Sequence, residues 1–361
     1  MGFAESTYAD LTWEGKSVQL DQIEQELHRL RGEAAATQGV RLPGHSKVLN
    51  LVVFAKQDTH IQAVHETVGR VSGRHPMRAI IVAADPDSVS SSLDTRIHTY
   101  CCQDPATGAQ LTCEQLLIVT TGEPARHVTG VVEQLLITDL PTYLWWSGEP
   151  EYKSENFSQL MRIAKKLILD SNTFASSAET LRQVAASSEG RSQVCAVTDL
   201  NWVRLSRWFE AVAQCFDDPR LRPHLSGIQR VRVEYAGTDA PPTQAALLAG
   251  WLFSRLGVSP ERVEFEASAF PVPSGQVTMF EIETHHGEQG LFQVRMKPGD
   301  RDHAVVRAQI SDSTVLEHSI HIGARSDAEL LDVSLESCQR DLPYEESLVV
   351  AAALLERNVA Q

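Results

Sequence analysis

The residues with the clearest potential for chemistry form a basic cluster. Arg162, Lys165 and Lys166 precede Asp170 and Ser171 by a few positions. Three cations near a hydroxyl group are suited to holding a phosphate. The more common interpretation is a solvated helix face that leads into a strand. The alternative is a sugar-phosphate-binding enzyme or sensor built on these residues.

Cysteine and histidine offer a second source of chemistry. Cys338 lies near Arg340 at the end of a charged helix, and a nearby cation favours the thiolate. Cys338 is therefore a candidate redox thiol, with an inert thiol as the alternative. His318 and His321 lie three apart in a strand pattern, so their rings point to opposite faces. No third ligand is near, and no metal site is expected.

The common catalytic motifs are missing from the sequence. It contains no GxGxxG, no GxxxxGK[ST] and no GxSxG. The six cysteines form no CxxC pair, which fits free thiols in a reducing compartment. The sequence therefore predicts no catalytic residue, no cofactor and no metal.

Composition limits the partners. The chain has 361 residues, 42% of them hydrophobic, and a net charge of −15. An acidic chain of this kind is not expected to bind nucleic acid or an anionic membrane surface. No apolar run reaches the length of a membrane span, and residues 1–10 lack a signal-peptide pattern, so a cytoplasmic protein is expected.

The elements of the first half predict an α/β domain over residues 1–150. An exposed arm and one helix are expected over 1–17 and 18–36. A strand, a helix and a second strand then follow the pattern of a parallel βαβ unit. A hairpin, a helix and an aromatic strand complete a mixed sheet covered by helices. The ranges are 47–55, 61–71, 77–84, 93–103, 111–120, 128–137 and 140–150.

The elements of the second half predict an α+β domain over residues 151–361. Its strand candidates alternate between apolar and polar residues, which indicates a largely antiparallel sheet with one solvated face. They cover 227–235, 263–267, 276–284, 290–297, 303–310 and 314–322, and the main helices cover 177–186, 207–217, 244–256, 326–337 and 343–356.

Tryptophan is the most distinctive feature of the middle of the chain. Trp145 and Trp146 are adjacent in a predicted strand, so they point to opposite faces. Either both pack in a sheet covered on both sides, or one contacts a ligand or a partner. Because Trp and Arg often anchor protein interfaces, the candidate partner-binding residues are Trp145, Trp146, Trp202, Arg204 and Trp208.

Four blocks in the same order resemble the OpcA family, the glucose-6-phosphate dehydrogenase assembly proteins. The first is Leu140-Pro141-x-x-Leu144-Trp145-Trp146-x-Gly148-x-Pro150. Leu167-Ile168-Leu169-Asp170-Ser171 is the second, and Asp199-Leu200-Asn201-Trp202-x-Arg204-Leu205-x-x-Trp208 is the third. The fourth is Leu247-Leu248-Ala249-Gly250-Trp251-Leu252-x-Ser254-Arg255-Leu256-Gly257.

The resemblance implies a protein that is not an enzyme. It implies that the chain binds glucose-6-phosphate dehydrogenase, stabilises its active oligomer and raises its activity in the oxidative pentose phosphate pathway. A scaffold without an effect on activity is a third hypothesis. The resemblance also implies thioredoxin as a partner, through cysteines of the C-terminal part. This sequence has only Cys338 beyond Cys215, so it lacks a second cysteine for a switch within that part.

Overall fold

The chain folds into two compact units, each made of discontinuous segments. Unit 1 comprises residues 1–169, 194–197 and 327–339, and unit 2 comprises 170–193, 198–326 and 340–361. The predicted boundary at residue 150 differs from this division, because two more strands follow the aromatic strand in the first sheet. The computed structural model describes residues 12–15, 19–38, 47–55, 61–103, 110–175, 177–189, 195–237, 242–257, 262–311 and 313–359.

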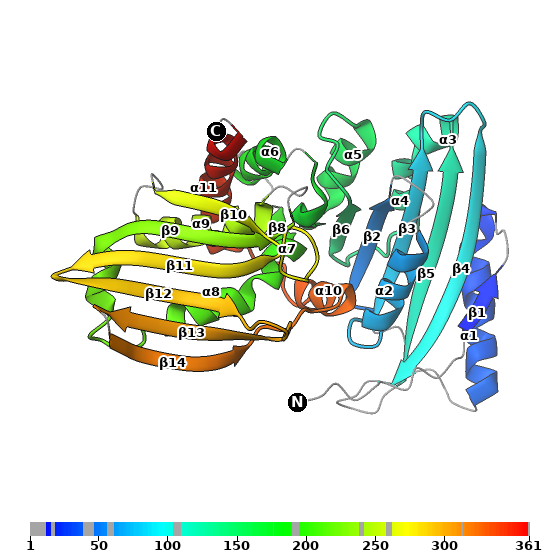
Figure 1. Ribbon diagram of the computed structural model, residues 1–361. Coiled ribbons are helices and arrows are strands. Elements are labelled where there is room, and N and C mark those ends of the chain that lie inside the picture. The colour runs from blue at the N-terminus through cyan, green and yellow to red at the C-terminus, as the bar shows by residue number, and fades with distance from the viewer. Residues whose placement is uncertain are drawn as a thin grey trace. The chain divides into compact units, whose positions relative to one another are not determined.

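The sheet of unit 1 has eight strands in the order β1-β4-β5-β3-β2-β6-β7-β8 (Figure 1). The pairs from β5 through β7 are parallel, and β1, β4 and β5 pair antiparallel. This confirms the predicted mixed sheet, the βαβ unit and the hairpin. The strands are β1 (Thr12–Gly15), β2 (Leu49–Ala55), β3 (Met77–Asp85), β4 (Ser92–Gln103), β5 (Gln110–Thr121), β6 (Thr142–Ser147), β7 (Lys166–Leu169) and β8 (Ala196–Asp199).

One prediction for the N-terminal arm is wrong. Residues 12–15 form the edge strand β1, in which Trp13 pairs with Thr99 of β4. No sequence pattern predicted this strand, because four residues are too few to show a period of two. The other residues of the predicted arm, 1–11 and 16–17, lie outside the described part of the chain.

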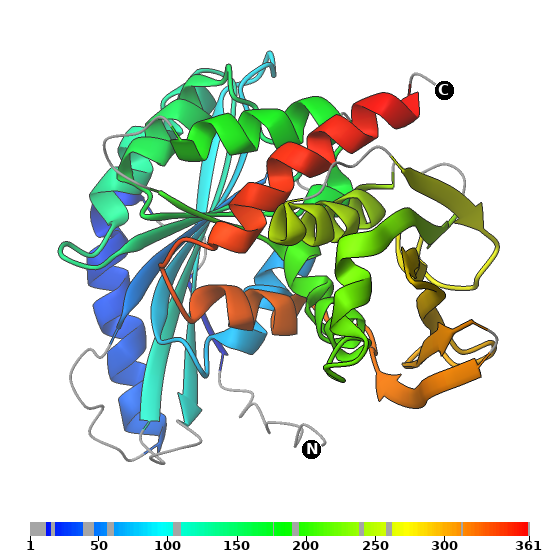
Figure 2. The ribbon, with the colours of Figure 1, turned by 90° about the vertical axis from the view of Figure 1, so that its left-hand side faces the viewer.

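Helices cover both faces of the unit 1 sheet, as Figure 2 shows from the side. Helices α2 (Ile61–Val71) and α10 (Asp327–Leu335) lie together on one face. On the other face, the Arg78 guanidinium reaches both Glu24 of α1 (Ile23–Gln38) and the carbonyl of Leu135 in α4 (Val128–Leu135). The smaller helical elements are η1 (Leu20–Gln22), α3 (Glu123–Arg126) and α5 (Glu155–Ile163).

The sheet of unit 2 has six strands in the order β10-β9-β11-β12-β13-β14. Only the β9–β10 pair is parallel, so the predicted largely antiparallel sheet is confirmed. The strands are β9 (Ile228–Ala236), β10 (Val263–Ser268), β11 (Val277–His286), β12 (Glu288–Met296), β13 (His303–Ile310) and β14 (Ser313–His321).

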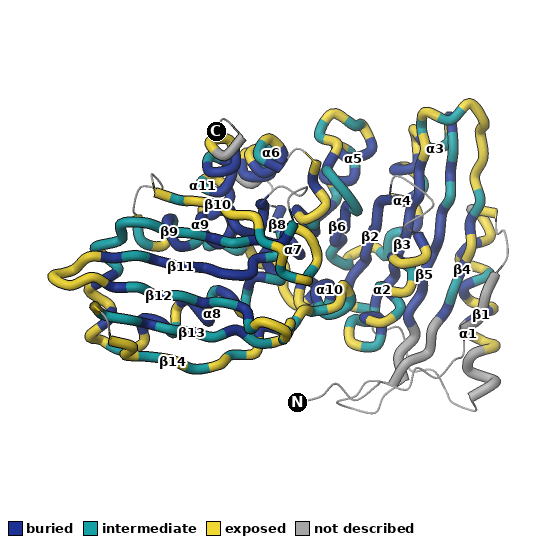
Figure 3. The backbone as a smooth tube through the Cα atoms, in the orientation of Figure 1, coloured by how far each residue is buried: buried dark blue, intermediate teal, exposed yellow. Residues whose placement is uncertain are grey.

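Burial alternates along β9, β12 and β13, whereas β11 is buried on both faces from Val277 to Ile282 (Figure 3). Val231 and Val233 of β9 are buried, and Arg230 and Arg232 on the other face form ion pairs with glutamates of the neighbouring strands. The distance from Arg232 to Glu281 is 2.9 Å. One face of this sheet therefore belongs to the core and the other is solvated.

Helices α8 and α9 pack against the apolar face of the unit 2 sheet. Helix α9 (Thr243–Leu256) contacts β9 and packs against α11 (Leu342–Val359), and α8 (Ser206–Gln214) contacts β12 and β13. Gly257 ends α9 in the left-handed conformation with φ 63°, directly after the predicted helix range 244–256. The other helical elements are η3 (Ser171–Thr173), α6 (Ser177–Glu189), α7 (Leu200–Arg204) and η4 (Arg222–Gly227).

Candidate functional site

Strand β6 carries the adjacent tryptophans through the middle of the unit 1 sheet. Trp145 is 7% exposed and Trp146 is 3% exposed. The Trp146 ring stacks on Phe54 at 4.3 Å between centroids and meets the edge of Phe157 at 4.9 Å. Its indole N–H donates to the carbonyl of Glu149 at 3.2 Å. Both rings therefore pack within a sheet that is covered on both sides, and a partner contact by either stays a prediction.

The tryptophans of unit 2 are also buried. Trp202 in α7 is 8% exposed, and Trp208 in α8 is 6% exposed. The Trp202 ring lies 4.3 Å from that of Phe209, and its indole N–H donates to the Asp341 carboxylate at 2.9 Å. These contacts give Trp202 a packing role that joins α7 to the start of α11. Contact between these rings and a partner stays a prediction.

Arg204 makes an ion pair with Asp170 rather than facing open solvent. Its two terminal nitrogens donate to the two Asp170 oxygens at 2.6 and 2.8 Å. Both side chains are 18% exposed. A bidentate pair of this kind fixes the position of both groups, so it ties η3 to α7.

Asp199 is the centre of a buried polar network beside this pair. Its carboxylate accepts hydrogen bonds from the backbone N–H groups of Ser171 at 3.0 Å and Asn201 at 2.9 Å. The Tyr344 hydroxyl donates to its other oxygen at 3.3 Å. Burial raises the pKa of Asp199 to about 6, and the nearby charge of Asp170 adds to the effect.

The sequence predicted only part of this network. Asp199 belongs to the third family-like block, and in the structure it is the N-cap of α7, where its carboxylate accepts from the N–H of Asn201. The sequence did not indicate Tyr344, which lies 145 positions away. No local pattern pairs two such residues, because their contact depends on how α11 packs in the unit.

The basic cluster of the sugar-phosphate hypothesis is divided by burial. Arg162 and Lys165 are exposed, whereas Lys166 is 3% exposed. The Lys166 ammonium donates to the carbonyl of Ser334 and to the carbonyl of Ser337, the latter at 2.6 Å. It also lies 5.7 Å from the centre of the Tyr143 ring. These contacts give Lys166 a structural role in joining β7 to the end of α10.

The cysteines differ strongly in exposure. Cys113, Cys195 and Cys215 are buried, and Cys338 is exposed. Burial raises the pKa of the Cys215 thiol to about 12, which makes it a poor nucleophile. Among the described cysteines, Cys338 therefore has the exposure that a redox thiol needs, and that role stays a prediction. The side chains of Cys101 and Cys102 lie outside the described residues.

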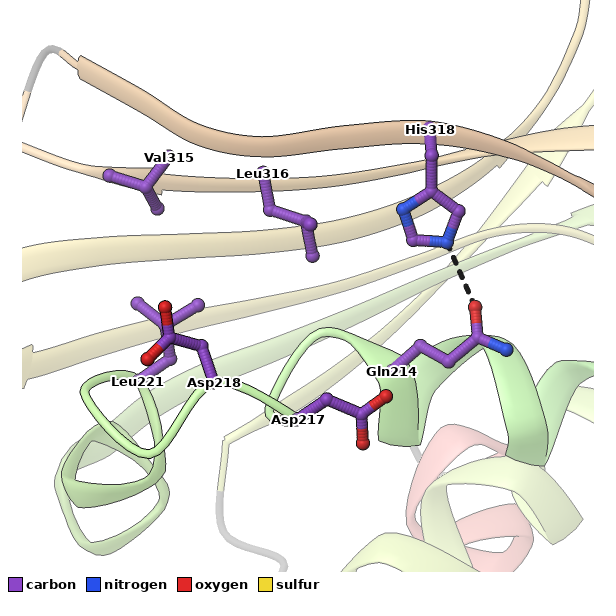
Figure 4. A pocket seen from close by; sticks show the side chains of 7 residues that line it. All are labelled: Gln214, Asp217, Asp218, Leu221, Val315, Leu316 and His318. Atoms are coloured by element: carbon purple, nitrogen blue, oxygen red, sulfur yellow. Dashed lines mark hydrogen bonds between the residues drawn. The ribbon is translucent and has the colours of Figure 1, made fainter.

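One pocket lies along the edge strand of unit 2. Its volume is about 330 Å³ (Figure 4). Apolar and acidic side chains share its wall, and His318 is hydrogen-bonded to Gln214 at 2.8 Å. The lining residues are Gln214, Asp217, Asp218, Leu221, Val315, Leu316 and His318. Within the described residues, no group of three or more His, Cys, Asp or Glu side chains is arranged to hold a metal ion.

No helix in the described parts of the chain combines the length and hydropathy that crossing a membrane requires.

Two family models match the chain, one after the other. The model described as the glucose-6-phosphate dehydrogenase subunit N-terminal domain matches residues 68–186. The model of the C-terminal domain of the same subunit matches residues 195–348.

Three curated relatives from cyanobacteria carry the name "OxPP cycle protein OpcA". Those from Synechocystis sp. and Nostoc punctiforme are 27% and 30% identical over 56% and 55% of this chain. The relative from Synechococcus elongatus is 28% identical over 74% of this chain. The matches span 42% of the first two relatives and 66% of the third.

The four sequence blocks lie in β6, β7, α7–α8 and α9, all inside the regions that the two models match. The sequence, the models and the relatives thus agree on one assignment, and the chain belongs to the OpcA family, the glucose-6-phosphate dehydrogenase assembly proteins.

Proposed function

We propose that this chain assists the assembly of glucose-6-phosphate dehydrogenase, activates it allosterically and catalyses no reaction itself. The observation that supports this most strongly is the pair of consecutive family models, both described as domains of the dehydrogenase subunit. The proposal places the protein in the cytoplasm and in the oxidative pentose phosphate pathway, which supplies NADPH.

The contacts of the motif residues support a role other than catalysis. Arg204 and Asp170 neutralise each other, and the Asp199 carboxylate accepts hydrogen bonds from its own unit. These groups are engaged in holding elements together. In this proposal they keep the unit rigid, so that its surface is already in the conformation that the partner binds.

Activation follows from selective binding. A protein that binds the active oligomer of the dehydrogenase more tightly than the inactive form shifts the population toward the active form. A tenfold preference shifts that equilibrium by about 1.4 kcal/mol per bound chain. The same coupling requires the dehydrogenase substrates to strengthen binding of this chain, if they favour the active form.

The test is an NADPH assay of the dehydrogenase with and without this chain, paired with a mass measurement of the dehydrogenase oligomer. The proposal expects higher activity and a shift in oligomer mass or stability, with no NADPH from this chain alone. Unchanged kinetics with an unchanged oligomer would contradict the proposal. Binding with unchanged kinetics would identify a scaffold, and turnover by this chain alone would identify an enzyme.

The sugar-phosphate hypothesis is tested in the same preparation. Arg162 and Lys165 remain exposed, whereas Lys166 is engaged with two carbonyls. We therefore expect glucose 6-phosphate alone to leave the melting temperature of this chain unchanged. A clear rise in the absence of the dehydrogenase would favour a sensor.

A further inference from the structure

Strand β14 is an open edge of the unit 2 sheet. It pairs only with β13, and its register is regular from Leu316 to His321. The N–H of Ile322 donates to the carbonyl of Asp302 at 2.7 Å. Because alternate residues of an antiparallel strand direct their backbone groups toward the partner strand, this bond shows which residues of β14 face β13. Glu317 and Ser319 then turn their backbone groups away from β13. No backbone partner for those groups is found in the described part of the chain.

From Leu316 to His321 this edge carries only part of the usual protection against pairing. Edge strands are normally protected by lysine or other charged side chains, by proline, by β-bulges or by shortness. The nine residues of β14 include neither lysine nor proline. Its one irregularity is a bulge, where Leu316 pairs with Ala308, Thr314 pairs with Gln309, and Val315 is left between them. Val315 is 48% exposed.

The pocket described above lies beside this same edge. Figure 4 shows Leu316 and His318 extending from β14 toward the loop that follows α8. Leu221 of that loop supplies an apolar wall, and Asp217 and Asp218 supply carboxylates. The pocket therefore offers an entering side chain both apolar surface and carboxylate groups.

The two carboxylates are not equivalent. The Arg220 guanidinium donates to Oδ1 of Asp218 at 3.1 Å and to Oδ2 at 2.6 Å. This pairing holds the pKa of the Asp218 carboxyl at about 2. Asp217 is exposed, and no described cation pairs with its carboxylate. A cation from another molecule would find its partner in Asp217.

We propose that β14 receives an extended segment of the dehydrogenase as a seventh strand, with one lysine or arginine side chain in the pocket. This inference rests on the proposed function. The free N–H and C=O groups of β14 supply the backbone pairing, as in other cases of strand addition. The aliphatic stem of the cationic side chain packs against Leu221 and Leu316, and its charge lies beside Asp217.

Charge argues against a second copy of this chain as the occupant. The net charge of −15 repels another copy. Antiparallel pairing of two β14 strands about their middle would also place Glu317 opposite its own copy, which is unfavourable. A basic extended segment meets neither difficulty.

The test measures the affinity of purified dehydrogenase for four variants of the full chain. Ser319→Pro removes an outward N–H without removing a bond to β13, and Ser319→Thr is its matched control. Asp217→Lys reverses the pocket charge, and Glu210→Lys makes the same change on the exposed side of α8. We expect Ser319→Pro and Asp217→Lys to weaken binding about tenfold or more, and the two controls to bind like the unmodified chain.

Hydrogen exchange gives a direct readout that needs no variant. Binding of the dehydrogenase should slow exchange in the segment 315–321. The urea midpoint of Ser319→Pro shows whether this variant folds. If it does not fold, the surface variant Asp217→Lys still tests the same edge.

Each outcome decides the inference. If the dehydrogenase binds all variants equally, or binds without protecting 315–321, the strand-addition site is wrong and the proposed function stands. If the unmodified chain does not bind at all, the proposed function fails and this inference fails with it. A dimer of this chain that Ser319→Pro dissolves would assign the edge to self-association and overturn the assigned partner.

Discussion

Asp199→Asn tests whether the buried carboxylate of unit 2 carries a free-energy penalty at neutral pH. Asp199 is fully buried, and its pKa is raised from 3.8 to about 6. A raised pKa means that the folded protein favours the protonated acid. The contribution of this group to stability is therefore complete below about pH 4 and is lost as the pH rises through 6.

The size of the effect follows from the shift. A change of about two pKa units corresponds to about 3 kcal/mol of unfolding free energy between the two ends of this range. Asparagine keeps an oxygen that accepts from the N–H groups of Ser171 and Asn201, and its amide faces the Tyr344 hydroxyl. The variant thus removes the charge and preserves most of the hydrogen bonding.

The assay is urea unfolding of the wild type and the variant at intervals from pH 4.5 to 7.5. The stability of Asp199→Asn relative to wild type should rise by about 2 kcal/mol across this range, most steeply near pH 5, and should level off above about pH 6.5. If the two units unfold separately, the effect belongs to the transition of unit 2. Comparing the variant with wild type at each pH cancels the titration of all other groups.

Asp218→Asn is the matched control. Arg220 lowers the pKa of the half-buried Asp218 to about 2, so this group stabilises the fold above its ordinary pKa and loses that contribution only as the pH falls toward 2. Its profile should run parallel to wild type throughout the tested range. Parallel profiles for Asp199→Asn as well, or a difference that shrinks as pH rises, would refute the reasoning about burial.

Three further predictions concern the contacts of single side chains. Arg204→Lys replaces a bidentate pair with a single contact to Asp170 and should lower the unfolding free energy by about 1–2 kcal/mol, with a double-mutant cycle against Asp170→Asn measuring the pairing. Little coupling in that cycle would show that the pair contributes nothing. Lys166→Met keeps the aliphatic stem but leaves the carbonyls of Ser334 and Ser337 without their cation, which should cost about 1–3 kcal/mol in urea unfolding; an unchanged midpoint would contradict it. Cys338 should react with maleimide in the native protein, whereas Cys113, Cys195 and Cys215 should react only after unfolding, as peptide mass mapping would reveal. Native labelling of the buried thiols would show that their units open readily.

Local patterns in the sequence determined the elements and their faces. The alternation of Val231 and Val233 with charged residues predicted a strand with one solvated side, and β9 has that form. Apolar residues at helical spacing from Ile61 to Val71 predicted α2. These predictions succeed because period two and period 3.6 are properties of neighbouring residues.

The tertiary structure alone decided what the polar and aromatic side chains do. Trp145 and Trp146 had to point to opposite faces, but only the helices on both sides of the sheet bury both rings. The sequence placed Lys166 in a basic cluster, but in the structure its ammonium group donates to two carbonyls at the end of α10. Burial and charge at a site are sums over neighbours that the fold brings from distant positions, so a local pattern does not contain them.

The same reason applies to Asp199 and to β14. The sequence placed Asp199 in a family-like block, whereas its raised pKa depends on the packing that excludes water from it. It also predicted a strand near 314–322, but only the order of the six strands makes that strand an edge. Sequence by itself therefore determined the family and the elements, whereas packing determined which groups are buried, paired or left open to a partner.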